Sequence, residues 1–69
     1  MTLSEFIKEL KHNSIWIGIL YRNADKSLFI DKLGVLIHWV DYPKYMNRKI
    51  ISITPMYQMT GLFIEIEEK

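Results

Sequence analysis

Strict alternation of apolar side chains in two stretches is the feature that most constrains the fold of this 69-residue chain. The alternating residues are Ile15, Ile17, Ile19 and Tyr21 in the first stretch, and Leu62, Ile64 and Ile66 in the second. Successive side chains of a strand point to opposite faces of a sheet, so each stretch predicts a strand with one face turned to a core. An apolar sheet face is stable only when a second layer covers it.

The segment 2–11 predicts a helix that supplies this second layer. Its apolar residues recur at the spacing of one buried helical stripe: Leu3, Phe6, Ile7 and Leu10. Thr2 and Glu5 have the spacing of a capping box, which fixes the start of the helix. Lys8 and Lys11 lie near its end, where positive charge complements the helix dipole.

The remaining segments complete a sheet. The polar run 23–26 predicts a hairpin loop between strands over 14–22 and 27–31. Pro43 can open a helical turn over 44–47, and two further strands are predicted over 49–54 and 62–67. Because helical and strand patterns are segregated along the chain, the fold class is α+β. We predict a single domain, residues 1–69, with the N-terminal helix packed on one face of a small antiparallel β-sheet of four to five strands.

The middle segment 32–42 leaves two alternatives open. Leu33, Ile37 and Val40 have near-helical spacing. The run 35–40, however, is rich in β-branched and aromatic residues, and Gly34 weakens a helix by about 1 kcal/mol. We favour a strand over 35–40 after a kink at Gly34.

The small size of the chain limits its core. A domain of this length buries only about 60% of the surface that its unfolded chain exposes. The sequence has no cysteine, so no disulfide stabilises it, and with two histidines a structural zinc site is not expected. The small core must therefore be stabilised by well-packed aromatic residues, which make up 13% of the chain, or by oligomerisation. We expect a homodimer.

Charge and hydropathy narrow the functional classes. The net charge of +1 is lower than that of most dedicated duplex-binding modules. No apolar run approaches the roughly 18 residues that span a bilayer, and the N-terminus lacks the pattern of a signal peptide. We therefore expect a cytoplasmic protein without membrane contact.

No catalytic motif is present, and we predict a protein that is not an enzyme and has no cofactor or metal. His12 and His38 are isolated and fit packed, hydrogen-bonded residues better than ligands. Glu65 and Glu67 share a strand face and could form a carboxylate pair, but acidic residues on a terminal edge strand more often prevent aggregation.

The sheet face away from the helix is not wholly polar. Trp16, Leu20 and Phe63 point there by strand parity, and Trp39 is a further candidate. Two interpretations stay open. Either the middle segment folds back over these residues as ordinary core, or they form an apolar patch rimmed by charge, which is typical of a protein interface.

A basic and aromatic segment over 42–49 is the second candidate site. Its candidate contact residues are Tyr42, Lys44, Tyr45, Arg48 and Lys49. Such a mixture can stack bases and neutralise phosphates, or form a protein hot spot. A solvated connection whose tyrosines close the edge of the core is the third interpretation. Met46, Met56 and Met59, in or near loops, either fill gaps or line an adaptable contact surface.

Four runs carry a resemblance to a known class of proteins. They are the opening Met-Thr-Leu-Ser-Glu-Phe-Ile-Lys-Glu-Leu, the strand Ile-Trp-Ile-Gly-Ile, and Met46-Asn-Arg-Lys-Ile-Ile-Ser-Ile with the later Gly-Leu-Phe-Ile-Glu-Ile. In this layout the chain resembles small accessory proteins of phages and mobile elements of low-GC Gram-positive bacteria. The resemblance implies a protein that binds and blocks host machinery, as anti-CRISPR and other anti-defence proteins do. The strongly acidic DNA mimics among them do not fit a net charge of +1.

The predicted function is therefore that of a non-enzymatic, phage-type binding protein that inhibits or modulates a host protein. The alternative is a small nucleic-acid or nucleotide-binding protein that uses residues 42–49.

Overall fold

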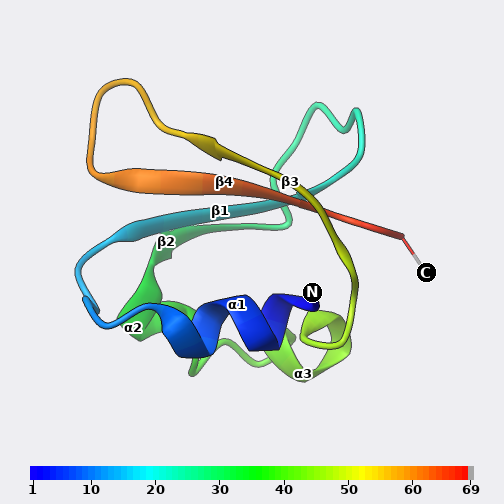
Figure 1. Ribbon diagram of the computed structural model, residues 1–69, viewed down its shortest axis with the longest axis horizontal. Coiled ribbons are helices and arrows are strands. Elements are labelled where there is room, and N and C mark those ends of the chain that lie inside the picture. The colour runs from blue at the N-terminus through cyan, green and yellow to red at the C-terminus, as the bar shows by residue number, and fades with distance from the viewer. Residues whose placement is uncertain (69) are drawn as a thin grey trace.

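The computed structural model describes residues 1–68 and arranges them in two layers. Figure 1 shows a twisted sheet with three short helices on one side, while the loops β1–β2 and β3–β4 rise on the other side. In chain order the elements are α1 (Leu3–Glu9), β1 (Trp16–Tyr21), β2 (Phe29–Lys32), α2 (Leu33–Leu36), α3 (Tyr42–Tyr45), β3 (Ile50–Pro55) and β4 (Gly61–Ile66). The α+β class and four predicted strands are confirmed, with ends that differ from the prediction by one to two residues.

The sheet is mixed, so the prediction of a purely antiparallel sheet is wrong. Its strand order is β2-β1-β4-β3. The pairs β1–β2 and β3–β4 are antiparallel, whereas the central pair β1–β4 is parallel, with Ile17 opposite Leu62 and Ile19 opposite Ile64. The physical reason is the crossover through α2 and α3, which carries the chain to the far edge before the second hairpin returns beside β1. Strand parity is the same in both orientations, so alternation alone could not distinguish them.

Helix α1 begins at the predicted capping box. The Thr2 amide donates to Glu5 Oε1 at 2.8 Å, and the Glu5 amide donates to Thr2 Oγ1 at 3.3 Å. The hydrogen bonds to Thr2 hold the pKa of Glu5 below its ordinary value. The helix ends at Glu9 because Leu10 adopts an extended backbone conformation, with φ −83° and ψ 133°. In residues 1–68 no helix has the length and apolar character needed to cross a membrane.

The core lies between the sheet and the helices. Its fully buried members come from the helices and from the inner face of the two central strands: Leu3, Leu36, Ile17, Ile19, Ile64 and Ile66. Ile7, Leu33 and Tyr45 are also buried in this cluster. Four residues of the inner-facing set predicted from alternation, Ile17, Ile19, Ile64 and Ile66, lie in this buried cluster, which also contains Leu3 and Ile7.

The middle segment is helical, so the strand predicted over 35–40 is wrong. Helix α2 occupies Leu33–Leu36, and a turn leads from it to α3. Leu33 and Leu36 are buried three residues apart, whereas Val35 and Ile37 are exposed. Burial of Leu33 and Leu36 outweighs the β propensity of Val35 and Ile37, because β propensity mainly measures how well a side chain packs in a sheet.

Candidate functional site

The outer face of the sheet carries side chains that no helix covers. The parallel register places Trp16, Gly18 and Leu20 of β1 beside Gly61, Phe63 and Glu65 of β4, and Ile30 of β2 lies opposite Gly18. These residues alternate with the core residues, so they face away from the helices. The structure therefore brings three predicted contact residues, Trp16, Leu20 and Phe63, to one face, and each is partly buried.

Two glycines let side chains lie directly on the backbone of this face. A Cβ atom on Gly18 would lie 2.6 Å from Phe63 Cδ1, and one on Gly61 would lie 2.6 Å from Met56 Sδ. Real Cβ atoms do not approach other atoms so closely. The Phe63 ring and the Met56 thioether therefore occupy space that any larger residue at these positions would fill.

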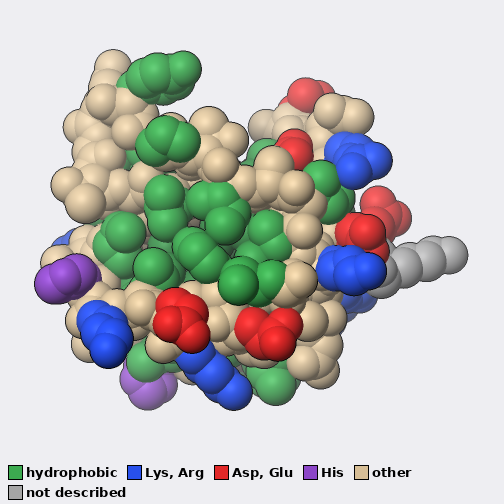
Figure 2. Space-filling view, viewed as in Figure 1, with side chains coloured by type: hydrophobic (Ala, Val, Ile, Leu, Met, Phe, Trp, Pro, Cys, Tyr) green, Lys and Arg blue, Asp and Glu red, His purple; other side chains and the backbone are tan. Residues whose placement is uncertain are grey.

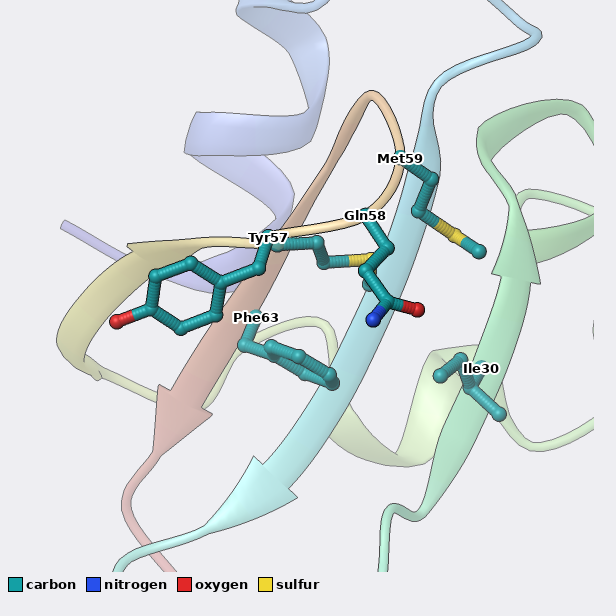
Figure 3. Close-up of a pocket in the computed structure, with 6 residues that line it drawn as sticks. Ile30, Tyr57, Gln58, Met59 and Phe63 are labelled. Carbon is teal, nitrogen blue, oxygen red and sulfur yellow. The ribbon is translucent and has the colours of Figure 1, made fainter.

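An open apolar hollow of about 310 Å³ lies beside this ring. Its lining residues come from β2, from β4 and from the β3–β4 loop: Ile30, Met56, Tyr57, Gln58, Met59 and Phe63. Figure 3 shows Phe63 between Tyr57 and Ile30, with Met59 and Gln58 projecting from the loop and Ile30 across from them on β2. The exposed fractions are high for apolar groups, at 52% for Ile30 and 48% for Met59.

The lining has the chemistry of a contact surface. It contains one amide, on Gln58, and one phenol, on Tyr57, and no carboxylate, imidazole or amine. The Tyr57 side chain is fully exposed, with a relative accessibility of 101%. Large apolar side chains that remain in water around a shallow hollow are typical of a site completed by another molecule.

Glu65 closes the far end of the outer face. Its carboxylate accepts a hydrogen bond from the Ser52 hydroxyl at 2.8 Å and one from the Asn23 amide at 3.4 Å. Asn23 has a positive φ of 57°, a conformation that asparagine tolerates better than most residues. The Glu65 carboxylate thus joins the β1–β2 loop to strand β3.

The basic and aromatic segment lies on the helix side of the molecule and is largely used for packing. The Tyr45 ring is only 7% exposed and stacks on Trp39, with ring centroids 5.5 Å apart and an interplanar angle of 11°. Trp39 also contacts Phe29, at 5.0 Å between centroids. The Tyr45 ring is therefore part of the core cluster, and a contact of Tyr45 with a partner stays a prediction.

The cations of this segment surround the same ring. Lys44 Nζ lies 5.4 Å, and Arg48 Cζ 5.9 Å, from the Tyr45 ring centroid, within the range of cation–π attraction. One guanidinium nitrogen of Arg48, Nη1, is buried without a hydrogen-bond partner.

Burial raises the pKa of the neighbouring Tyr21, and the hydroxyl of Tyr45 raises it further. Burial also raises the pKa of Tyr42.

The nine predicted contact residues therefore separate into two groups. The first group lies on the outer face and consists of Trp16, Leu20 and Phe63. The second group comes from the segment 39–49 around α3 and consists of Trp39, Tyr42, Lys44, Tyr45, Arg48 and Lys49. The exposed residues Ile30, Tyr57 and Gln58 were not predicted. Ile30 lies within the strand predicted over 27–31. Which face of the sheet its side chain occupies depends, however, on the pairing register of this strand with β1, and the sequence does not specify that register.

The described residues contain no arrangement suited to a metal ion. Within 1–68 no three side chains of His, Asp or Glu lie close enough together to hold one. Comparison of the chain with protein-family models, with curated proteins and with solved structures gives no match.

Proposed function

We propose that this protein is a non-enzymatic binding protein that holds a partner protein through the apolar hollow on the outer face of its sheet. The observation that supports this proposal most strongly is the hollow beside Phe63, which the exposed side chains of Ile30, from β2, and Met59, from the β3–β4 loop, line together. A large apolar side chain of a partner would fill this space and remove both residues from water. Burial of apolar surface contributes roughly 25 cal/mol per Å².

The composition of the lining supports recognition of a protein over a chemical reaction. A nucleophile needs an adjacent base, and the lining contains neither a serine nor a histidine. Flexible methionine side chains adapt to the shape of an apolar partner group, as Met56 and Met59 can do here. Tyr57 adds the kind of aromatic side chain that is enriched in protein hot spots.

The resemblance to phage accessory proteins favours a host protein in the bacterial cytoplasm as the partner, with inhibition or modulation as the outcome. The runs that carry the resemblance include β1 and β4, the strands that form the floor of the hollow.

Nucleic acid is the less favoured partner. Lys44 and Lys49 are exposed and can contact phosphate, but the stacking half of such a site is weakened by the burial of Tyr45. Sequence-tolerant binding of single strands depends on stacking as well as on charge.

A peptide-display selection on the immobilised protein tests the proposal. We expect the selected peptides to share a large apolar residue and to bind with little dependence on salt, since no charged group lines the hollow. Ile30→Lys, which introduces a charge at the rim, should weaken binding about tenfold or more, equivalent to about 1.4 kcal/mol.

Val40→Lys is the matched control, because Val40 is 85% exposed and lies outside the hollow. Equal loss in both variants would contradict the proposed site. Submicromolar, salt-sensitive binding of short DNA or RNA that depends on Lys44 and Lys49 would favour the alternative function instead.

A further inference from the structure

The two edge strands of the sheet differ in how they are protected. Strand β2 is four residues long and includes Asp31 and Lys32. Strand β3 has six residues, Ile-Ile-Ser-Ile-Thr-Pro, and no charge, and its pairing register with β4 shifts between Ile50 and Ser52. Natural edge strands usually carry charges, bulges or covering segments that prevent pairing with another chain.

The N-terminus covers only the beginning of the β3 edge. The Ile50 amide donates to the Met1 carbonyl at 2.9 Å, and Thr2 forms a bridge with Lys49. This pairing shows that the edge accepts an antiparallel neighbour. The stretch 51–55 lies beyond it, and its last three residues, Ile53, Thr54 and Pro55, are exposed.

The free edge presents its hydrogen-bonding groups at Ile53. The Met56 amide donates to the Gly61 carbonyl, so Met56 points toward β4. Because successive residues of a strand alternate in direction, the amide and carbonyl of Ile53 point away from β4. The same holds for Pro55, which has no amide hydrogen, and a proline at this position limits pairing beyond it.

We propose that β3 pairs antiparallel with β3 of a second copy of this chain, around a two-fold axis at Ile53. The regular part of this edge that keeps its amide hydrogens, 52–54, is centred on this residue. Antiparallel pairing about Ile53 sets it opposite its own copy, and the two residues exchange both backbone hydrogen bonds. Ser52 then lies opposite Thr54 of the second copy on the outer face, a favourable cross-strand pair of hydroxyl side chains.

A second copy suits this edge because its sequence is self-complementary about the axis. No charged side chain within the stretch meets a like charge, since the stretch has none. Ile53 is 39% exposed on the inner side of the sheet, and contact with its copy would cover it. Figure 2 shows apolar side chains gathered over the strands and above α1, with charged side chains along the rim. The interface is small, so we expect a dimer with a micromolar dissociation constant.

This arrangement leaves the hollow free. A two-fold axis perpendicular to the sheet keeps both outer faces on the same side, and Ile30 lies on the opposite edge strand. The dimer proposed here therefore uses the edge of the sheet, not the outer-face residues Trp16, Leu20 and Phe63, and it can fail while the proposed function holds.

Cysteine cross-linking tests the pairing, because the natural sequence contains no cysteine. Residues opposite one another in a hydrogen-bonded pair have Cα atoms about 5.5 Å apart, which fits a disulfide. In a glutathione redox buffer we expect Ile53→Cys to form a covalent dimer about tenfold faster than Ile30→Cys, an exposed control on the other edge. Equal rates for both variants would overturn the proposal.

Sedimentation velocity gives a second, independent measurement. The unmodified protein should shift from monomer to dimer with rising concentration, whereas Ile53→Lys should stay monomeric because two lysines would meet at the axis. Ile30→Lys should dimerise normally, and circular dichroism should show that both variants are folded. A protein that stays monomeric up to millimolar concentration, or an Ile53→Lys variant that still dimerises, would refute the edge pairing. If Ile53→Lys does not fold, the cross-linking rates decide.

Discussion

Replacing Gly18 by alanine tests the close contact that forms the floor of the hollow. The new Cβ would lie 2.6 and 2.7 Å from Cδ1 and Cε1 of Phe63. Carbon atoms prefer separations of about 3.5–4.0 Å, so the ring must move by about 1 Å. Phe63 is held in register opposite Gly18, so this displacement strains the face on which the hollow depends.

Two opposing contributions determine the magnitude. Overpacking of this kind costs about 1–3 kcal/mol. Alanine recovers about 0.5–1 kcal/mol, because glycine loses more conformational freedom in a strand. We therefore expect Gly18→Ala to lower the free energy of unfolding by about 1 kcal/mol and the melting temperature by about 4–8 °C.

Thermal unfolding followed by circular dichroism measures the effect, and Gly34→Ala is the control. A Cβ on Gly34 would meet Asn13 Cβ at 3.4 Å, an ordinary contact, so we expect stabilisation of about 0.5 kcal/mol. In a Phe63→Ala background the penalty of Gly18→Ala should disappear, since the ring that causes it is gone. A Gly18→Ala variant that is more stable than the natural protein, or a penalty unchanged without Phe63, would refute the reasoning.

Further predictions concern the core, the tyrosines and the basic segment. Leu3→Ala should lower the free energy of unfolding by about 2–5 kcal/mol in urea titrations, and Phe6→Ala by less, because Leu3 is fully buried and Phe6 only partly. Tyr21 keeps its proton to higher pH in the folded than in the unfolded protein, so stability should fall as the pH rises above about 10. Urea unfolding at about pH 9 and about pH 11 should show a smaller fall in Tyr21→Phe. Replacing both Lys44 and Lys49 by alanine should change stability by no more than about 0.5 kcal/mol and leave peptide binding intact in a polarisation assay.

The parts of the fold that follow from local chemistry were predictable from the sequence. Thr2 and Glu5 specify the start of α1 through two reciprocal hydrogen bonds between neighbouring residues. Alternation assigns Ile17 and Ile64 to the core, because the side-chain period of a strand is fixed by its backbone. The parallel pairing of β1 with β4 depends instead on where the crossover returns the chain, and no local pattern encodes this.

The segment of α2 and α3 shows how burial decides between competing propensities. Val35, Ile37 and Val40 favour a strand as residue types, yet all three are exposed. The two leucines of α2 are buried against the sheet, and the Leu33 amide donates to the Ile15 carbonyl at 2.8 Å. These tertiary contacts were not available to an argument from the sequence.

The candidate site was predictable only in part, because it too depends on contacts between segments that are distant in the sequence. Strand parity gives the common face of Trp16 and Phe63, whereas the hollow also needs Met59 from the β3–β4 loop and Ile30 from the opposite edge strand. The basic segment had the composition of a contact surface, but stacking on Trp39 uses Tyr45 for the core.

The position of the hollow follows from the arrangement of the layers. All three helices lie on one side of the sheet, so the second face has only the β1–β2 and β3–β4 loops on its side (Figure 1). Met56 returns from this loop onto the Gly61 backbone and covers one end of the face. The other end is held by the hydrogen bonds of Glu65. Between these two fixed ends, Gly18 provides no side chain of its own, and the Cδ1–Cε1 edge of the Phe63 ring lies against its backbone. The apolar surface that results is open to solvent because no other element of residues 1–68 lies over it, and in the proposed function a partner supplies this missing layer.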